Sequence, residues 1–149
     1  ENSPLGYPTN GERCYDGLNC YRDFERGSIY WYNGYFAYAN YGQIAQKYRE
    51  IGRNKSAMGY PRMDQVCGLA RGGCYQAMQG VNGSIYYSPK TGAHVLLGGI
   101  KSKWMQLGYE WGRLGYPTSD EYMISGGVRQ DFEGGSITWK NGQAYESYR

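Results

Sequence analysis

The sequence predicts an α+β domain made of tandem repeats, with three antiparallel β-meanders and two interspersed amphipathic helices. Two recurring strings support this fold class. The first occurs as "LGYPTNGE" from Leu5, "MGYPRMDQ" from Met58 and "LGYPTSDE" from Leu114. The second follows each copy, as "GSIYW" at residues 27–31, "GSIYY" at 83–87 and "GSITW" at 135–139. Because the first string recurs at intervals of 53 and 56 residues, one structural unit is copied along the chain.

The chain therefore reads as a single domain, residues 1–149, of two complete units and a truncated third. Unit one covers residues 5–57, unit two covers 58–113, and unit three covers 114–149. The segment "YGQIAQKYREIGRNKSAMGYP" at 41–61 aligns without a gap on "LGGIKSKWMQLGYEWGRLGYP" at 97–117. A short meander with one helix cannot bury its own apolar face, so we expect the units to pack on one another.

Each unit begins with a predicted three-stranded meander. In unit one, the runs "CYRDFE", "SIYWY" and "YFAYA" are separated by Arg-Gly and Asn-Gly. Asn-Gly between two β-prone runs is a strong hairpin signal, and it recurs as "KNG" in unit three. Unit two has "PKTG" at the corresponding turn.

A helix is predicted after the first two meanders. In unit two, the apolar residues Ile100, Trp104, Leu107 and Trp111 have the spacing of one helix face. Unit one matches with Ile44, Tyr48 and Ile51. Both helices run into glycine and then into the Gly-Tyr-Pro string, where proline excludes the preceding residue from the helical region. We therefore interpret Gly-Tyr-Pro as the structural corner between one helix and the next sheet.

The four cysteines form two local pairs in the sequence. Cys14 and Cys20 lie in unit one, Cys67 and Cys74 occupy similar places in unit two, and unit three lacks both. Joint loss of both members favours the disulfides Cys14–Cys20 and Cys67–Cys74, although four cysteines allow three pairings. The gaps exceed the usual spacing of zinc ligands, so we expect no metal. Disulfides indicate an oxidising, extracellular setting.

The composition limits the classes of partner. Of 149 residues, 24 are Gly and 18 are Tyr, which is typical of many turns and of strands with aromatic surfaces. The net charge of +3 is spread out and forms no Lys/Arg stripe, so we expect no nucleic acid. No apolar run approaches the roughly 20 residues of a membrane span, so we expect no membrane insertion. The start at "ENSPLGYP" is typical of a mature or trimmed N terminus.

These markers resemble the LGFP repeat, whose pattern runs from a tryptophan helix through L-G-(F/Y)-P-T-x-x-E and Q-x-F-x-x-G-S-I-x-W to G-A-H. Unit three matches best, with "LGYPTSDE" and "RQDFEGGSITW", and unit two supplies "TGAHVLLGGIKSKW". Unit two departs from the pattern with Gln65 for the glutamate, and the cysteine pairs are a further departure. The resemblance implies a secreted, cell-wall-associated module that binds polysaccharide and is not catalytic.

The residues themselves also argue against an enzyme. The single histidine, His94, stands where the other units have tyrosine, so the position does not require a base. The carboxylates occupy equivalent positions in different units, Glu12 with Glu121 and Asp23 with Asp131. They recur because the unit recurs, which is poor evidence for a single catalytic pair. No nucleotide-binding or metalloprotease motif is present, so we expect neither catalysis nor a cofactor.

Aromatic side chains are the predicted ligand-binding groups, because their rings stack on the C–H faces of sugars. Taking Ile29, Ile85 and Ile137 as core markers, the alternation places Trp31, Tyr87 and Trp139 toward the core. It places Tyr30, Tyr32 and Tyr86 outward, as a tyrosine shelf, and cross-strand tyrosine pairing that only stabilises the sheet is the competing interpretation. The candidate ligand-binding residues are Tyr30, Tyr32, Tyr35, Tyr38, Tyr86 and His94, with the polar partners Arg22, Asp23, Gln76, Gln130 and Asp131.

Two functions compete at this point. A secreted module that binds polysaccharide or cell-wall glycan is predicted to be retained on the polymer and released by free sugar. A structural or protein-interaction module, such as a matrix or filament subunit, is predicted to self-associate independently of sugar. The low charge and the abundance of glycine and tyrosine also suit the lateral packing that the second function needs.

Overall fold

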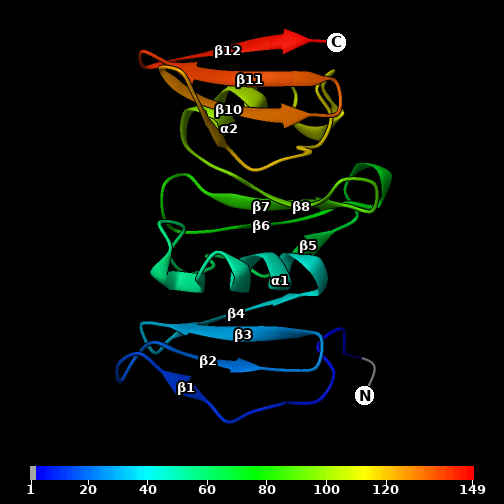
Figure 1. Ribbon diagram of the computed structural model, residues 1–149. Helices are drawn as coiled ribbons and strands as arrows, with labels where there is room; N and C mark the ends of the chain where they lie inside the picture. Colours follow the sequence, from blue (N-terminus) through cyan, green and yellow to red (C-terminus); the bar gives the residue numbers. More distant parts are fainter. Residues whose placement is uncertain (1–2) are drawn as a thin grey trace.

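The computed structural model describes residues 3–149, and it shows three antiparallel sheets stacked with one helix between each neighbouring pair (Figure 1). The first sheet lies at the N-terminal end of the stack and the last sheet carries the C terminus, so the stack is open. No helix within residues 3–149 combines the length and the apolar character needed to cross a bilayer.

The α+β repeat fold predicted from the sequence is confirmed. The first sheet contains β1 (Arg13–Cys14), β2 (Cys20–Asp23), β3 (Gly27–Tyr32) and β4 (Phe36–Tyr41). The second contains β5 (Val66–Cys67), β6 (Cys74–Ala77), β7 (Ser84–Ser88) and β8 (Gly92–Leu96). The third contains β9 (Tyr122–Ile124), β10 (Gly127–Phe132), β11 (Gly135–Lys140) and β12 (Gln143–Tyr148). The helices are α1 (Gly42–Glu50) and α2 (Gly98–Gln106), with short 3₁₀ turns η1 (Arg53–Lys55), η2 (Ala70–Gly72) and η3 (Tyr109–Trp111).

Each meander has four strands, so the prediction of three strands was wrong by one short strand per unit. The additional strands β1 and β5 have two residues each, and β9 has three. Strands this short carry no visible alternation, which is why the pattern did not reveal them.

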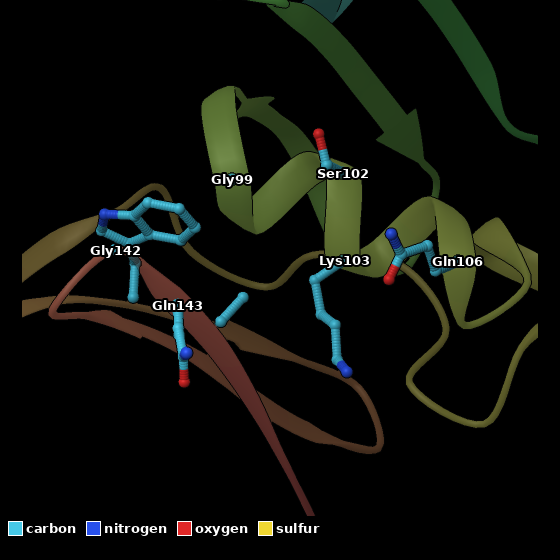
Figure 2. Close-up of a pocket in the computed structure, with 8 residues that line it drawn as sticks. Gly99, Ser102, Lys103, Gln106, Gly142 and Gln143 are labelled. Carbon is cyan, nitrogen blue, oxygen red and sulfur yellow. The ribbon is translucent and has the colours of Figure 1, made fainter.

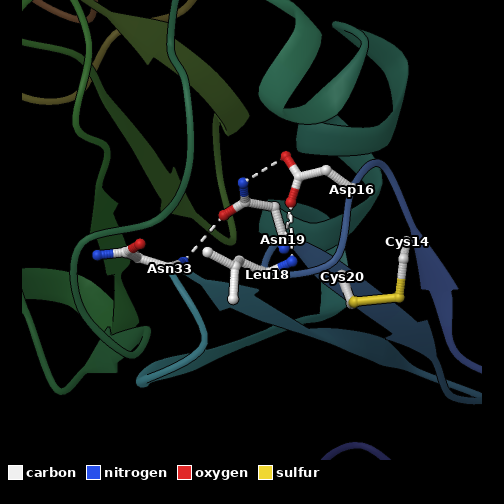
Figure 3. Close-up of a disulfide and its surroundings, with 6 residues drawn as sticks. All are labelled: Cys14, Asp16, Leu18, Asn19, Cys20 and Asn33. Carbon is white, nitrogen blue, oxygen red and sulfur yellow. Dashed lines mark hydrogen bonds between the residues drawn. A yellow bond between two sulfur atoms is a disulfide. The ribbon is translucent and has the colours of Figure 1, made fainter.

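Both predicted disulfides are confirmed, and each joins the additional strand to its neighbour. Cys14 lies opposite Cys20, and Cys67 lies opposite Cys74, in antiparallel register. In the loop that the Cys14–Cys20 bond closes, a carboxylate oxygen of Asp16 accepts hydrogen bonds from the backbone N–H groups of Leu18 and Asn19, at 2.8 and 3.0 Å (Figure 3). Each covalent bond therefore fixes a strand that is too short to be stable by pairing alone.

Two hydrophobic cores hold the three sheets together. The first core surrounds α1 and is formed by Tyr30, Ile44, Tyr48, Met58, Cys74, Met78, Ile85 and Val95. The second core surrounds α2 and is formed by Tyr86, Leu96, Ile100, Trp104, Leu114, Tyr116, Phe132 and Ile137. Neighbouring residues of β7 enter different cores, since Ile85 belongs to the first and Tyr86 to the second. The middle sheet is therefore buried on both faces.

This layering makes the prediction of an outward tyrosine shelf wrong at two positions. Tyr30 is 1% exposed and Tyr86 is 5% exposed, because each packs against the helix of its own unit. Tyr87 and Trp139, predicted to face the core, are partly buried at the edges of the two cores. In the second sheet, Ile85 packs toward α1 and Tyr86 packs toward α2, and in the third sheet Ile137 packs toward α2. In a strand of alternating residues, one set of side chains faces solvent only if the sheet is covered on one side and open on the other.

The helices end earlier than the apolar spacing predicted. The helix α2 stops at Gln106, and Gly108 follows in the left-handed region with a φ of 103°. Trp111, predicted to lie on the buried helix face, falls in η3 and is 75% exposed. The helix α1 ends in the same way before Gly52, whose φ is 98°.

The Gly-Tyr-Pro corner has the structural role that the sequence indicated. Gly59 and Gly115 have φ values of 68°, a backbone conformation that favours glycine over other residues. The hydroxyl of Tyr48 donates a hydrogen bond to the carbonyl of Gly59 at 2.6 Å. The indole N–H of Trp104 donates to the carbonyl of Gly115 at 2.9 Å. The central aromatic residue of each helix thus holds the corner that starts the next unit.

Candidate functional site

A groove between α2 and the β11–β12 hairpin is the strongest candidate binding site. It has a volume of about 460 Å³, within the range of roughly 300–1,000 Å³ that is typical of ligand sites. Figure 2 shows Lys103 extending from α2 and Gln143 standing on the hairpin across from it. The residues that line the groove are Gly99, Ser102, Lys103, Gln106, Trp139, Gly142, Gln143 and Ala144.

The absence of a side chain at Gly99 allows the Trp139 ring to lie directly against the helix. A Cβ atom at Gly99 would lie 2.1 Å from the Trp139 ring, far closer than any real contact. The corresponding groove between α1 and β8 is lined by Gln43, Gln46, Lys47, Glu50 and Ala93, and its volume is only about 140 Å³. Gln43 stands at the position of Gly99. The groove between units two and three is therefore wider than the equivalent groove between units one and two.

The groove combines an aromatic surface with polar groups at its rim. The ammonium of Lys103 lies 2.9 Å from a carboxylate oxygen of Glu146, and its hydrogen bond lowers the pKa of Glu146. Ser102 accepts a hydrogen bond from the side-chain amide of Asn82 at 3.2 Å. The amides of Gln106 and Gln143 are exposed and offer both donors and acceptors. Such a set binds hydroxyl-rich ligands, with the aromatic ring supplying the apolar contact.

The three units of the structure coincide with a known repeat. The sequence profile of the LGFP repeat matches residues 5–56, 58–112 and 114–147. The chain belongs to the LGFP repeat family. LGFP repeats are cell-wall-associated repeat modules. No curated protein matches the sequence of the chain.

Two of the predicted polar ligand groups instead connect successive LGFP units. The amide nitrogen of Gln76 donates to the carbonyls of Ala39 and Met63 at 3.0 and 2.9 Å. The amide nitrogen of Gln130 donates to the carbonyls of Val95 and Ser119 at 2.8 and 2.7 Å. Both glutamines are fully buried, so they tie a strand of the preceding unit to the next corner and are inaccessible to ligand.

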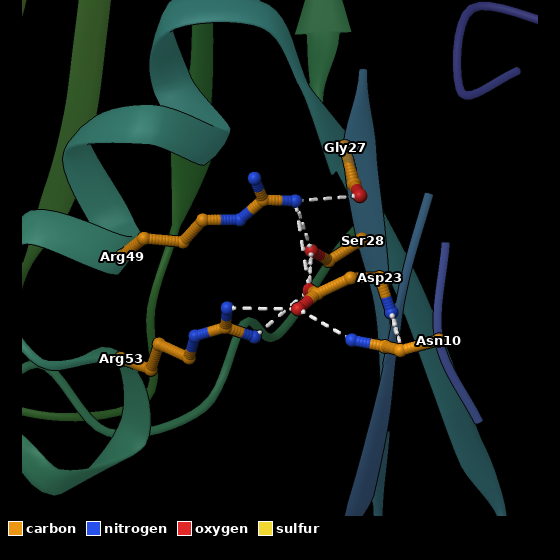
Figure 4. Close-up of polar contacts among 6 residues, drawn as sticks. All are labelled: Asn10, Asp23, Gly27, Ser28, Arg49 and Arg53. Atoms are coloured by element: carbon orange, nitrogen blue, oxygen red, sulfur yellow. Dashed lines mark hydrogen bonds and ion pairs between the residues drawn. The ribbon is translucent and has the colours of Figure 1, made fainter. Parts of the chain in front are cut away.

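Two more predicted polar residues, Arg22 and Asp23, hold unit one together. The guanidinium of Arg22 donates from Nε to the carbonyl of Asn10 at 3.0 Å. Asp23 accepts two hydrogen bonds from Arg53, at 3.0 and 3.1 Å, and one from Ser28 at 2.6 Å (Figure 4). Burial raises the pKa of Asp23, but the hydrogen bonds from Arg53 and Ser28 outweigh it, so the pKa lies below its ordinary value.

Replacing Asp23 with alanine is expected to lower the free energy of unfolding by about 2 kcal/mol at pH 7, because the partly buried guanidinium of Arg53 loses its carboxylate partner. The carboxylate of Asp23 stabilises the fold above its unfolded-state pKa of 3.8, and this contribution is lost as pH falls through the lower folded-state value. Urea unfolding at pH 7 and pH 3 measures the difference, which should shrink at pH 3. A difference that persists undiminished at pH 3 would show that charge is not its source.

The remaining predicted ligand residues do not gather into one site. Asp131 is bound by its own neighbours, the Tyr122 hydroxyl at 3.0 Å and Arg129 Nε at 3.2 Å. His94 contacts the carbonyl of Thr91 at 2.8 Å, and its other ring nitrogen lies 3.6 Å from Asp120. Tyr32, Tyr35 and Tyr38 lie together on the β3–β4 hairpin of unit one, and their role in binding stays a prediction.

The residues of the groove itself were largely missed by sequence reasoning. Trp139 was predicted to face the core, and Lys103, Gln106 and Gln143 were not considered. One signal was present, since Gly99 directly precedes Ile100, the first residue of the predicted helix face, where unit one has Gln43 before Ile44. A glycine in place of a side chain at the start of a helix indicates a close contact with another part of the chain.

Proposed function

We propose that this LGFP protein is a secreted, non-catalytic module that binds polysaccharide in the groove between α2 and the β11–β12 hairpin. The observation that carries the proposal is the Trp139 ring, supported by Gly99 and surrounded by exposed amide groups. Sugar rings have apolar C–H faces and polar edges, and this arrangement offers a partner for both. The cell-wall association of the family and the two disulfides support an extracellular polymer as the ligand.

Replacing Trp139 with alanine is expected to weaken retention on insoluble cell-wall polysaccharide at least tenfold, which corresponds to about 1.4 kcal/mol. The reason is the loss of the stacking surface in the groove. Depletion binding to the polymer, with competition by soluble oligosaccharide, measures the effect.

Tyr87→Ala is the matched control, because Tyr87 occupies the same repeat position beside the narrower groove of about 140 Å³. It removes similar packing and should retain binding. Tyr35→Ala tests the tyrosines of the β3–β4 hairpin, since Tyr35 is 86% exposed. Loss of binding in Tyr35→Ala with full binding in Trp139→Ala would move the site to that hairpin and refute the groove.

The alternative function, a structural or protein-interaction module, gives a different result. It predicts self-association on size-exclusion chromatography that soluble glycan does not disturb. It also predicts that Trp139→Ala and the wild-type protein are retained on the polymer to the same extent.

A further inference from the structure

Unit two differs from unit one in the polar cluster beneath its helix. In unit one, the carboxylate of Asp23 accepts hydrogen bonds from Ser28 and Arg53, and Arg49 lies 3.5 Å away. Aligning the repeats places Ala77, Ser84, Met105 and Tyr109 at the positions of Asp23, Ser28, Arg49 and Arg53. Unit two thus keeps the serine but has replaced both the carboxylate and its arginine partners.

A buried cation stands in this altered cluster. Lys101 replaces Ala45 of unit one, and it is 4% exposed on the face of α2 that turns toward the middle sheet. Its ammonium donates one hydrogen bond, to the hydroxyl of Ser84 at 2.7 Å. Within residues 3–149, no carboxylate lies within 4.0 Å of the Lys101 ammonium. A buried lysine normally has an acidic partner, because the desolvated charge is otherwise costly.

Lys101 lines a cavity of about 180 Å³. Ala77 and Ser84 lie in its wall, together with Tyr75 and Tyr109, and a second cation, Arg62, also lines it. Arg62 and Tyr109 are exposed, so part of the cavity wall is in contact with solvent. The volume is smaller than the roughly 300–1,000 Å³ of sites that enclose a whole ligand, so the cavity fits a single functional group.

We propose that this cavity binds a carboxylate group of an external ligand, which takes the place that the side chain of Asp23 occupies in unit one. Lys101 and Arg62 supply the positive charge, and the Ser84 hydroxyl supplies the same contact that Ser28 makes to Asp23. Burial lowers the pKa of Lys101 to about 8, with a further contribution from Arg62, which is the effect expected of a cation that lacks its counter-charge. The site is independent of the Trp139 groove, which lies against the third sheet.

The test is titration of the full chain with acetate, glucuronate and glucose, each followed by the NMR signal of the Lys101 side chain. Acetate and glucuronate are expected to bind with a Kd in the millimolar range and glucose to leave the signal unchanged. Equal affinity for the two acids identifies the carboxylate alone as the recognised group, and tighter glucuronate binding identifies an acidic sugar. No shift with either acid, or the same shift with glucose, overturns the proposal.

Two variants make the test specific. Ala77→Asp installs the internal carboxylate that unit one has, and it should weaken acetate binding at least tenfold while keeping the fold. Lys101→Met removes the cation, and isothermal titration should then detect no acetate binding. Lys90→Met is the control, because Lys90 is an exposed lysine in the turn between β7 and β8, outside both the cavity and the groove, and its loss should leave acetate affinity unchanged. Undiminished acetate binding in folded Lys101→Met refutes the site, whatever happens to polysaccharide binding.

Discussion

Replacing Trp104 with alanine is expected to lower the free energy of unfolding by about 4 kcal/mol, the largest effect of any single change considered. Trp104 is 0% exposed in the second core, with ring centroids 4.8 Å from Tyr86 and 6.3 Å from Phe132. The change removes this packing and also leaves the carbonyl of Gly115 without its hydrogen-bond donor at 2.9 Å. Urea unfolding followed by circular dichroism measures the loss.

Trp111→Ala is the control for this prediction, since the apolar spacing in the sequence placed Trp104 and Trp111 on the same helix face. The structure places Trp111 in η3 with an exposed side chain, so its replacement should change the free energy by less than about 0.5 kcal/mol. Comparable losses in the two variants would contradict the position of the helix end at Gln106.

The features that the sequence predicted correctly are those encoded locally. The recurring strings define the units, the joint absence of both cysteines in unit three predicted the disulfide pairs, and the Gly-Tyr-Pro corner follows from backbone preferences. The centres of the helices were also correct, because Ile44, Tyr48, Ile100 and Trp104 are all buried.

The errors arose where a residue's environment depends on the stacking of units. Tyr86 alternates with isoleucine as in a half-exposed sheet, yet both faces of the middle sheet are covered. In the first sheet, the face covered by α1 is that of Tyr30, and Ile29 on the other face is only partly buried. Similarly, Gln76 and Gln130 are polar, but each is buried by donating to one carbonyl of the preceding unit and one of its own unit. Alternation identifies which residues share a face, and it does not reveal whether that face is covered.

The residues of the candidate groove were harder to predict from the sequence. One wall of the groove comes from α2 and the other from the β11–β12 hairpin, and η3, β9 and β10 lie between these elements in the chain. Only the exchange of Gln43 for Gly99 indicated a special contact, and nothing in the sequence identified Trp139 as its partner. Differences between equivalent positions of the units mark both sites, since Ala77 likewise stands where unit one has Asp23.

Raising the pH from 7 to 9.5 is expected to stabilise the wild-type chain by about 2 kcal/mol through Lys101 alone. Burial holds the pKa of Lys101 at about 8 in the folded state, against an ordinary value of 10.5 in the unfolded chain. Between these values the unfolded chain binds more protons than the folded chain, so stability rises with pH. The groups that face Lys101 are Ser84, Arg62, Tyr75, Tyr86 and Tyr109, and burial raises the pKa of Tyr86, which therefore stays neutral in the fold.

Lys101→Met isolates this effect from the other ionisable groups. The variant removes the desolvated charge and should be more stable than wild type by about 2–3 kcal/mol at pH 7. Its advantage should fall progressively toward pH 9.5, since wild-type Lys101 becomes neutral over that range. Urea unfolding of both proteins at several pH values gives the difference directly. A constant difference would mean that Lys101 stays charged in the fold over this whole pH range, which would contradict the lowered pKa.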